Sequence, residues 1–203
     1  MADTKISALT SLTGANTAST TDVLAIVDTS ATTTKKITRA ELFDISDPTG
    51  GQIVFPTTQN ASSNAYTFDD YREGTWTPVL QGTGGGPLTH SAQVGDYIKI
   101  GKLVHISGYV AISGGTPITG GVTIEGLPFN TQTKSNYFAV ITPGNYSAVF
   151  DVNYTQLSLV INSNASGILV FENGNSQASA SIPPAQIGTG FFLEFAGSYI
   201  AAA

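Results

Sequence analysis

From about residue 71 onward, the sequence is a series of short apolar segments separated by turn-forming residues. In Leu103–Ile112, one side of the alternation carries Val104, Ile106, Val110 and Ile112, and the other carries His105, Ser107 and Tyr109. A period of two is typical of a β-strand with one buried face. Further segments of this kind are Val94–Ile100, Val122–Ile124, Phe138–Ile141, Ala148–Val152, Leu157–Ile161, Ile168–Glu172, Ala178–Ile182 and Phe191–Phe195. About eight to ten short strands at this spacing predict an all-β fold, an antiparallel β-sandwich of the jelly-roll kind over residues 71–203.

The composition supports this fold class. Charged residues make up 11% of the chain, against roughly 25% in an ordinary soluble domain. The chain also holds 22 glycines, 27 threonines and 19 serines. A mostly helical fold is disfavoured because helix surfaces depend on Glu, Lys, Arg and Leu, whereas Thr-rich and Gly-rich sequences favour strands and turns.

Residues 1–47 follow a different pattern. Asp22–Asp28 is an apolar run bounded by turn formers, and Thr34–Ile37 follows a Thr-rich turn, so the two predict a small hairpin. Thr38-Arg-Ala-Glu41 is a capping-box pattern that predicts one short helix of about two turns. Residues 48–70 mix Pro, Gly, Asn and Ser and are expected to form a linker before the domain 71–203.

Several functional classes are excluded or disfavoured by residue counts. The chain has no cysteine and two histidines, so disulfides, thiol catalysis and His-rich metal centres are excluded. Its net charge of −6 disfavours nucleic acid and anionic membranes as partners. No apolar run reaches the roughly 18 residues of a membrane span, and no secretory signal is visible.

The sequence holds no recognisable catalytic or cofactor-binding motif. Asp69 and Asp70, with Glu73 nearby, could form a calcium site or a glycosidase pair, but solvated charges at the linker junction are the favoured interpretation. The glycine-rich string Gln81–Pro87 lacks a following helix and a basic residue, so a surface loop is expected. We therefore predict no catalytic residue, metal or cofactor, and a protein that is not an enzyme; a polysaccharide depolymerase is the minor alternative.

Aromatic residues supply the candidate contact sites. Trp76, in the distinctive string Tyr71–Pro78, is interpreted as a core or interface anchor, with Arg72 and Glu73 as an exposed pair; a sugar-stacking platform with Tyr97 or Tyr109 is the alternative. Residues 103–203 hold five charged residues, which suggests that much of this surface faces protein and that the chain forms a homo-oligomer. The candidate trimer-interface or glycan-facing residues are Trp76, Tyr97, His105 and Tyr109.

Two parts of the sequence resemble tailed-bacteriophage virion surface proteins. KISAL at 5–9, LTGA at 12–15, DVLAIVD at 22–28 and KKITRAEL at 35–42 resemble the N-terminal attachment segment of tail fibres, head fibres and capsid-decoration proteins. FDDYREGTWTP at 68–78, GDYIKIGKLV at 95–104 and GLPF at 126–129 are similar to a β-rich module near the C-terminus of phage fibre proteins. No motif of this resemblance lies in the C-terminal third.

The resemblance implies that residues 1–47 attach to the virion and that the β-rich part is displayed as a homotrimer. The chain would be made in the host bacterial cytoplasm and end on the virion surface, docked on the major capsid protein or on a tail or portal adaptor. Because no shaft is present, a short head fibre or capsid-decoration protein is favoured, and a tail fibre that binds host surface polysaccharide is the alternative. The expected anchor residues are Ile6, Leu9, Leu12, Val23, Leu24, Ile26, Val27, Ile37, Leu42 and Phe43.

Overall fold

The computed structural model describes residues 23–28, 33–38, 46–47, 52–53, 64, 66–68, 70–147 and 150–202. For the first four of these ranges it describes the backbone alone. The chain divides into two compact units, residues 1–57 and 58–203. The division into 1–47, 48–70 and 71–203 stays a prediction.

The first unit contains the predicted hairpin. β1 (Val23–Asp28) pairs antiparallel with β2 (Thr33–Thr38), with Val23 opposite Thr38. β3 (Ser46–Asp47) pairs with β4 (Gln52–Ile53). The predicted helix beyond Thr38 lies outside the described residues, as do the expected anchors Ile6, Leu9, Leu12, Leu42 and Phe43 and the side chains of the other five.

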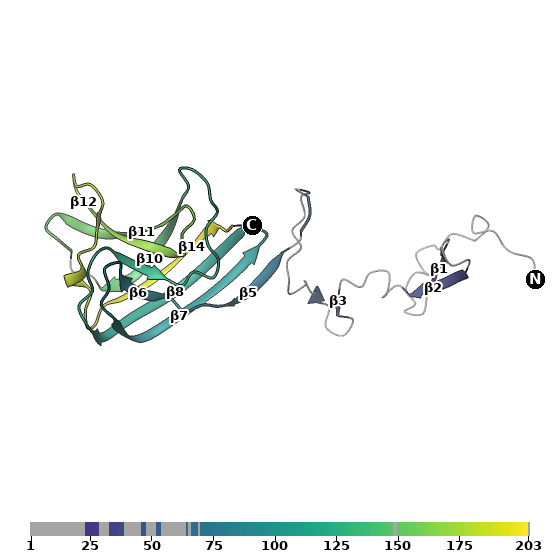
Figure 1. The fold of residues 1–203 in the computed structure, drawn as a ribbon, viewed down its shortest axis with the longest axis horizontal. Coiled ribbons are helices and arrows are strands. Elements are labelled where there is room, and N and C mark those ends of the chain that lie inside the picture. The colour runs from purple at the N-terminus through teal and green to yellow at the C-terminus, as the bar shows by residue number, and fades with distance from the viewer. Residues whose placement is uncertain are drawn as a thin grey trace, which may run out of the picture. The chain divides into compact units, whose positions relative to one another are not determined.

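The second unit is an all-β domain, as predicted, built from one antiparallel sheet of ten strands (Figure 1). A single 3₁₀ turn, Pro184–Gln186, lies in the described part of this unit. The strands are β5 (Tyr71–Thr75), β6 (Val79–Gly82), β7 (Leu88–Ile100), β8 (Leu103–Gly115), β9 (Val122–Glu125), β10 (Phe138–Ser147), β11 (Tyr154–Asn162), β12 (Gly167–Gly174), β13 (Ala180–Ser181) and β14 (Phe192–Ile200). Their order is β5-β7-β8-β14-β10-β11-β12-β9-β6, with β13 beside β12.

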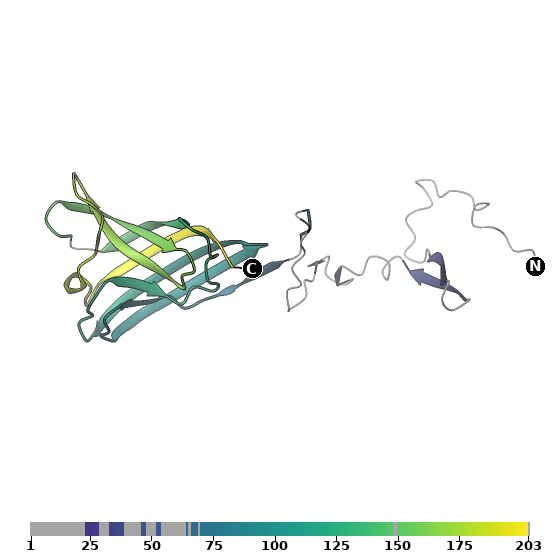
Figure 2. The ribbon, with the colours of Figure 1, turned by 45° about the horizontal axis from the view of Figure 1, so that its top comes forward.

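The jelly-roll sandwich expected from the sequence is replaced by this one curled sheet. The reason is the run of residues 71–82: β5 pairs with β7 at one edge, and β6 pairs with β9 at the other. Because β5 and β6 are consecutive, one short stretch of chain joins both edges and the sheet must curl. Figure 2 shows the late strands, in green, lying across from the early ones, in teal.

Side chains bridge the gap where the curled edges meet. The backbone N–H of Leu80 donates to Nε2 of His90 at 3.2 Å, and Nε2 of Gln93 donates to the carbonyl of Pro78 at 2.8 Å. These bonds link the β6 segment to the first half of β7. β5 does not pair with that half, because it pairs only with residues 96–100 of β7. We call this line of contact the seam.

The seam makes stability depend on pH. Burial lowers the pKa of His90 below its ordinary value of 6.5. Backbone hydrogen bonds with Leu80 and Leu88 act to raise the same pKa, but their effect is smaller. Because the folded pKa is the lower one, the unfolded chain takes up the proton first, and the stabilisation present above pH 6.5 is lost as the pH falls. Urea denaturation should show unfolding free energy falling from pH 6.5 to about pH 5 more steeply in the wild type than in His90→Gln. Equal slopes in the two proteins would refute this role.

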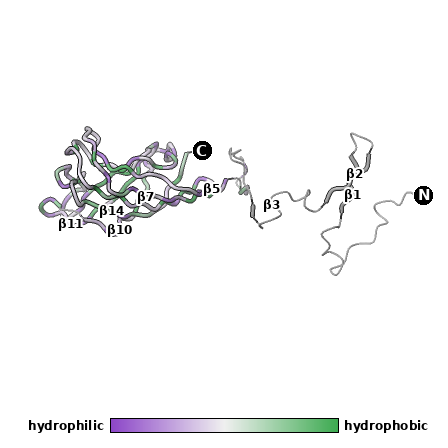
Figure 3. The backbone as a smooth tube through the Cα atoms, turned by 90° about the horizontal axis from the view of Figure 1, so that it is seen from below, coloured by the Kyte–Doolittle hydropathy of each residue, from purple (hydrophilic) through white to green (hydrophobic). Residues whose placement is uncertain are grey.

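The core lies inside the curl and follows the predicted alternation. Val104, Ile106 and Val110 of β8 are fully buried, whereas His105 between them is exposed. β10, β11, β12 and β14 add further buried aliphatic and aromatic side chains. Figure 3 shows hydrophobic and hydrophilic residues interleaved along the strands of this domain.

Strand bounds differ from the predictions in identifiable places. β7 begins at Leu88 and not at Val94. It turns into β8 at Gly101, which has a φ of 56°, with Ile100 opposite Leu103. The predicted strand 148–152 is wrong over its described residues, 150–152. There the chain turns, because the Tyr154 N–H donates to the Asp151 carbonyl at 3.0 Å and Asn153 has a φ of 74°.

Candidate functional site

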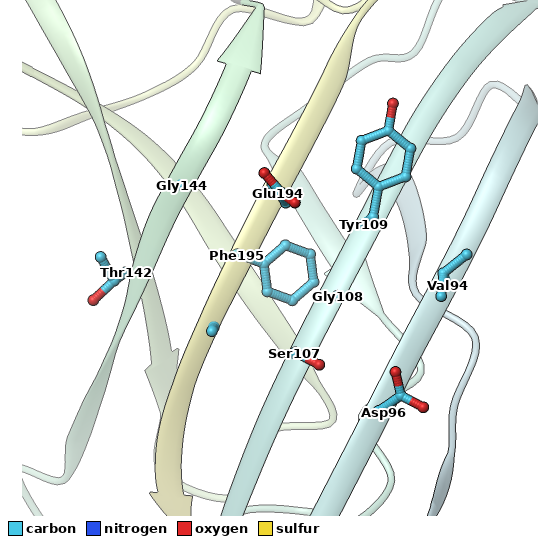
Figure 4. A pocket seen from close by; sticks show the side chains of 10 residues that line it. Val94, Asp96, Ser107, Gly108, Tyr109, Thr142, Gly144, Glu194 and Phe195 are labelled. Atoms are coloured by element: carbon cyan, nitrogen blue, oxygen red, sulfur yellow. The ribbon is translucent and has the colours of Figure 1, made fainter.

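A groove of about 430 Å³ lies on the outer face of β7, β8, β14 and β10 (Figure 4). Small residues in the middle of the face, such as Gly108, Gly144 and Ala196, leave this space open. Gly108 is small because a Cβ there would lie 2.4 Å from Cζ of Phe195, which is 3% exposed and packs in the core. The lining residues are Val94, Asp96, Ser107, Gly108, Tyr109, Thr142, Gly144, Glu194, Phe195 and Ala196.

The groove carries negative charge and hydroxyl groups. Asp96 and Glu194 are its charged lining residues, both exposed, and no lysine or arginine is among the lining side chains. Tyr109 is half-buried, and its ring packs on Phe192 with centroids 6.3 Å apart, so the ring is held in place beside the groove. An aromatic ring next to carboxylates and hydroxyls suits a neutral, hydroxyl-rich ligand, because anions would be repelled.

Of the four predicted contact residues, the structure places only Tyr109 in the groove. Trp76 is 8% exposed and lies in the core, where its Nε1–H donates to the Ser107 carbonyl at 3.1 Å. It is therefore the core anchor of the favoured interpretation and is not available to stack on a sugar. Tyr97 is half-buried against Phe129, with ring centroids 5.4 Å apart. His105 is exposed, and its Nδ1 lies 3.1 Å from the Ser198 hydroxyl oxygen.

The charges before β5 differ from the expectation. Asp70 was expected to be solvated, but it is 3% exposed, as is Lys99, whose ammonium binds the Asp70 carboxylate and the Gly101 carbonyl. Arg72 was expected to pair with Glu73, but its Nε donates to Asp70 at 3.1 Å. The register of β5 with β7 sets Arg72 opposite Lys99, which brings both cations to one carboxylate. Asp69 lies outside the described residues.

Among the described residues, no group of three or more His, Cys, Asp or Glu side chains could hold a metal ion. None of the helical segments described there is long and apolar enough to cross a bilayer.

Exposed hydrophobic side chains gather on the face that carries the groove. Ile100 and Leu103 are opposite each other at the β7–β8 turn and are 47% and 48% exposed. Ile98, Phe138 and Val140 are 44%, 64% and 70% exposed. We call these five residues the apolar patch; its large exposed side chains are of the kind found at protein interfaces.

Comparisons with known proteins find a likeness of fold. No protein-family model matches the chain, and no curated protein sequence matches it. The crystal structure of the Dettilon tailspike protein (gp208) is similar, with a TM-score of 0.53 and 18% sequence identity. The similarity covers 64% of this chain and 23% of the tailspike chain, so the present sequence corresponds to a minor part of that protein.

Proposed function

We propose that this chain is a non-enzymatic structural protein of a tailed-phage virion, located on the tail and used to bind the host surface. The observation that carries the proposal is the likeness of its fold to part of a tailspike protein. The phage-type motifs at residues 5–42 and 68–129 support the same class. The absence of a shaft in the sequence favours a head fibre or capsid-decoration protein, whereas the tailspike likeness favours the alternative, a tail protein.

The outer groove is the surface we propose for host contact. Its ring, hydroxyls and carboxylates match a neutral host surface glycan, with Tyr109 as the stacking residue and Asp96 and Glu194 as acceptors for sugar hydroxyls. No nucleic acid, membrane or cofactor is part of the proposal.

Attachment would come from residues 1–47, and the apolar patch is proposed to contribute to homotrimer contacts. Three copies on one virion site would raise the effective concentration of both anchors and grooves, so that weak single contacts give lasting attachment. Locating the chain on intact phage particles with gold-labelled antibody tests the assignment. Label on the tail supports it, and absence of label from the particle would refute it.

A further inference from the structure

A second, smaller pocket of about 230 Å³ lies between β9 and the β11–β12 turn. Unlike the groove, it is lined mainly by amide, hydroxyl and carboxylate side chains, with no aromatic ring. Its lining residues are Thr123, Glu125, Asn162, Asn164, Ala165, Ser166, Gly167 and Leu169. We call it the Glu125 pocket.

Thr123 lines this pocket, and its hydroxyl has no hydrogen-bond partner among the described residues. Thr123 is 4% exposed, and its Oγ1 is buried and makes no hydrogen bond to any described residue. Its neighbours Val122 and Ile124 belong to the core, so alternation puts Thr123 and Glu125 on the opposite side of β9. A buried polar group left unpaired destabilises the folded chain, and a bound ligand that pairs with it would remove that cost.

The Glu125 carboxylate lies directly over Gly167. A Cβ on Gly167 would lie 2.5 Å from Cδ and from both carboxylate oxygens, so only glycine leaves room for this position. Within the described residues its one hydrogen bond comes from the Ser166 hydroxyl at 3.4 Å, and it forms no ion pair. The carboxylate therefore retains free acceptor positions that face the pocket.

The turn that completes the pocket is fixed by Thr131. The buried Thr131 hydroxyl donates to the Asn162 carbonyl at 2.6 Å and accepts from the Ala165 N–H at 2.8 Å. Asn164 has a φ of 54°, the conformation that this turn requires. The side-chain amides of Asn162 and Asn164 make no hydrogen bond to described residues, so both can serve a ligand.

We propose that the Glu125 pocket binds one neutral sugar residue. The carboxylate would accept from two adjacent hydroxyls, the two amides and the Thr123 hydroxyl would donate and accept, and Leu169 would contact the C–H face. Sugar acids are disfavoured by charge, because Glu125 lines the pocket and no cation does. Calcium is a poorer occupant, since it takes 6–8 oxygen ligands, usually with several carboxylates. This inference rests on the proposed function in one respect, the host surface glycan as the source of the sugar.

Saturation-transfer difference NMR on the full chain tests this. The probes are methyl glycosides of glucose, galactose and mannose, with N-acetylglucosamine and glucuronic acid. We expect at least one neutral probe to bind and glucuronic acid to bind more weakly. Affinity should fall about tenfold or more in Gly167→Ala, which displaces the carboxylate, and in Glu125→Gln, which removes its charge. Gly188→Ala, where a Cβ meets nothing within 4 Å, should leave the affinity unchanged.

Three outcomes would overturn the inference. The first is the absence of binding by every neutral probe. The second is binding that survives Gly167→Ala and Glu125→Gln but is lost in Tyr109→Ala; the host-binding groove would then stand while the Glu125 pocket falls. The third is that calcium chloride alone binds and that Glu125→Gln abolishes its binding, which would make this a cation site. Circular dichroism confirms folding, and Glu125→Gln suffices if Gly167→Ala misfolds.

Discussion

Replacing Asp70 with leucine should lower the free energy of unfolding by about 3–5 kcal/mol, because it leaves a buried ammonium without its carboxylate. Lys99 is 3% exposed and binds the Asp70 carboxylate, so the substitution strands the Lys99 charge beside the Gly101 carbonyl and the Phe129 ring. Urea denaturation followed by circular dichroism near neutral pH measures the change.

Two further variants separate this mechanism from simple loss of packing. Asp70→Leu combined with Lys99→Met removes both charges and should recover most of the loss, since an apolar pair of similar size fits a buried site. Arg72→Met should cost at most about 1 kcal/mol, because the Arg72 side chain is 34% exposed. The loss of unfolding free energy in the double variant is compared with the sum of the losses in Asp70→Leu and Lys99→Met measured separately. If the two are equal, the stranded charge is not the cause.

Replacing Trp76 with alanine should cost a similar amount, about 3–5 kcal/mol, through the cavity it leaves. The Trp76 ring contacts Phe195 edge-on, with centroids 6.0 Å apart. It also fills the space beside Gly95, where a Cβ would lie 2.5 Å from its Nε1. Trp76 is, in addition, the first residue after β5 in the run that joins both sheet edges. Thermal and urea unfolding measure the loss.

Trp76→Phe is the matched control, since it keeps a ring but loses the bond to the Ser107 carbonyl. It should cost about 1–2 kcal/mol, between the wild type and the alanine variant. An alanine variant within about 1 kcal/mol of the wild type would show that Trp76 is not a core anchor, since surface substitutions are the ones with effects that small.

The sequence predicts the strands of the domain better than it predicts how they join. β8 could be predicted because its inner face is apolar at every second residue. β5, with the sequence Tyr-Arg-Glu-Gly-Thr, has no alternating apolar pattern. It is stabilised instead by pairing with β7 and by the buried Asp70 that precedes it. The change from a sandwich to one curled sheet follows from β5 and β6, so it could not be predicted from periodicity.

The two candidate sites show the same limit. Tyr109 was predictable as an outward residue of an alternating strand, whereas Asp96 and Glu194 join it only through the pairing of β7, β8 and β14. The Glu125 pocket needs β9 beside β12, which sets Glu125 opposite Gly167. Nothing in the local sequence around either residue indicates that contact.

The position and copy number of the chain on intact phage particles test the central claim most directly. Gold-labelled antibody raised against residues 70–202, imaged by electron microscopy, should mark the tail with a handful of copies per particle. Label spread over the head at dozens to hundreds of copies would contradict the tail assignment and favour capsid decoration.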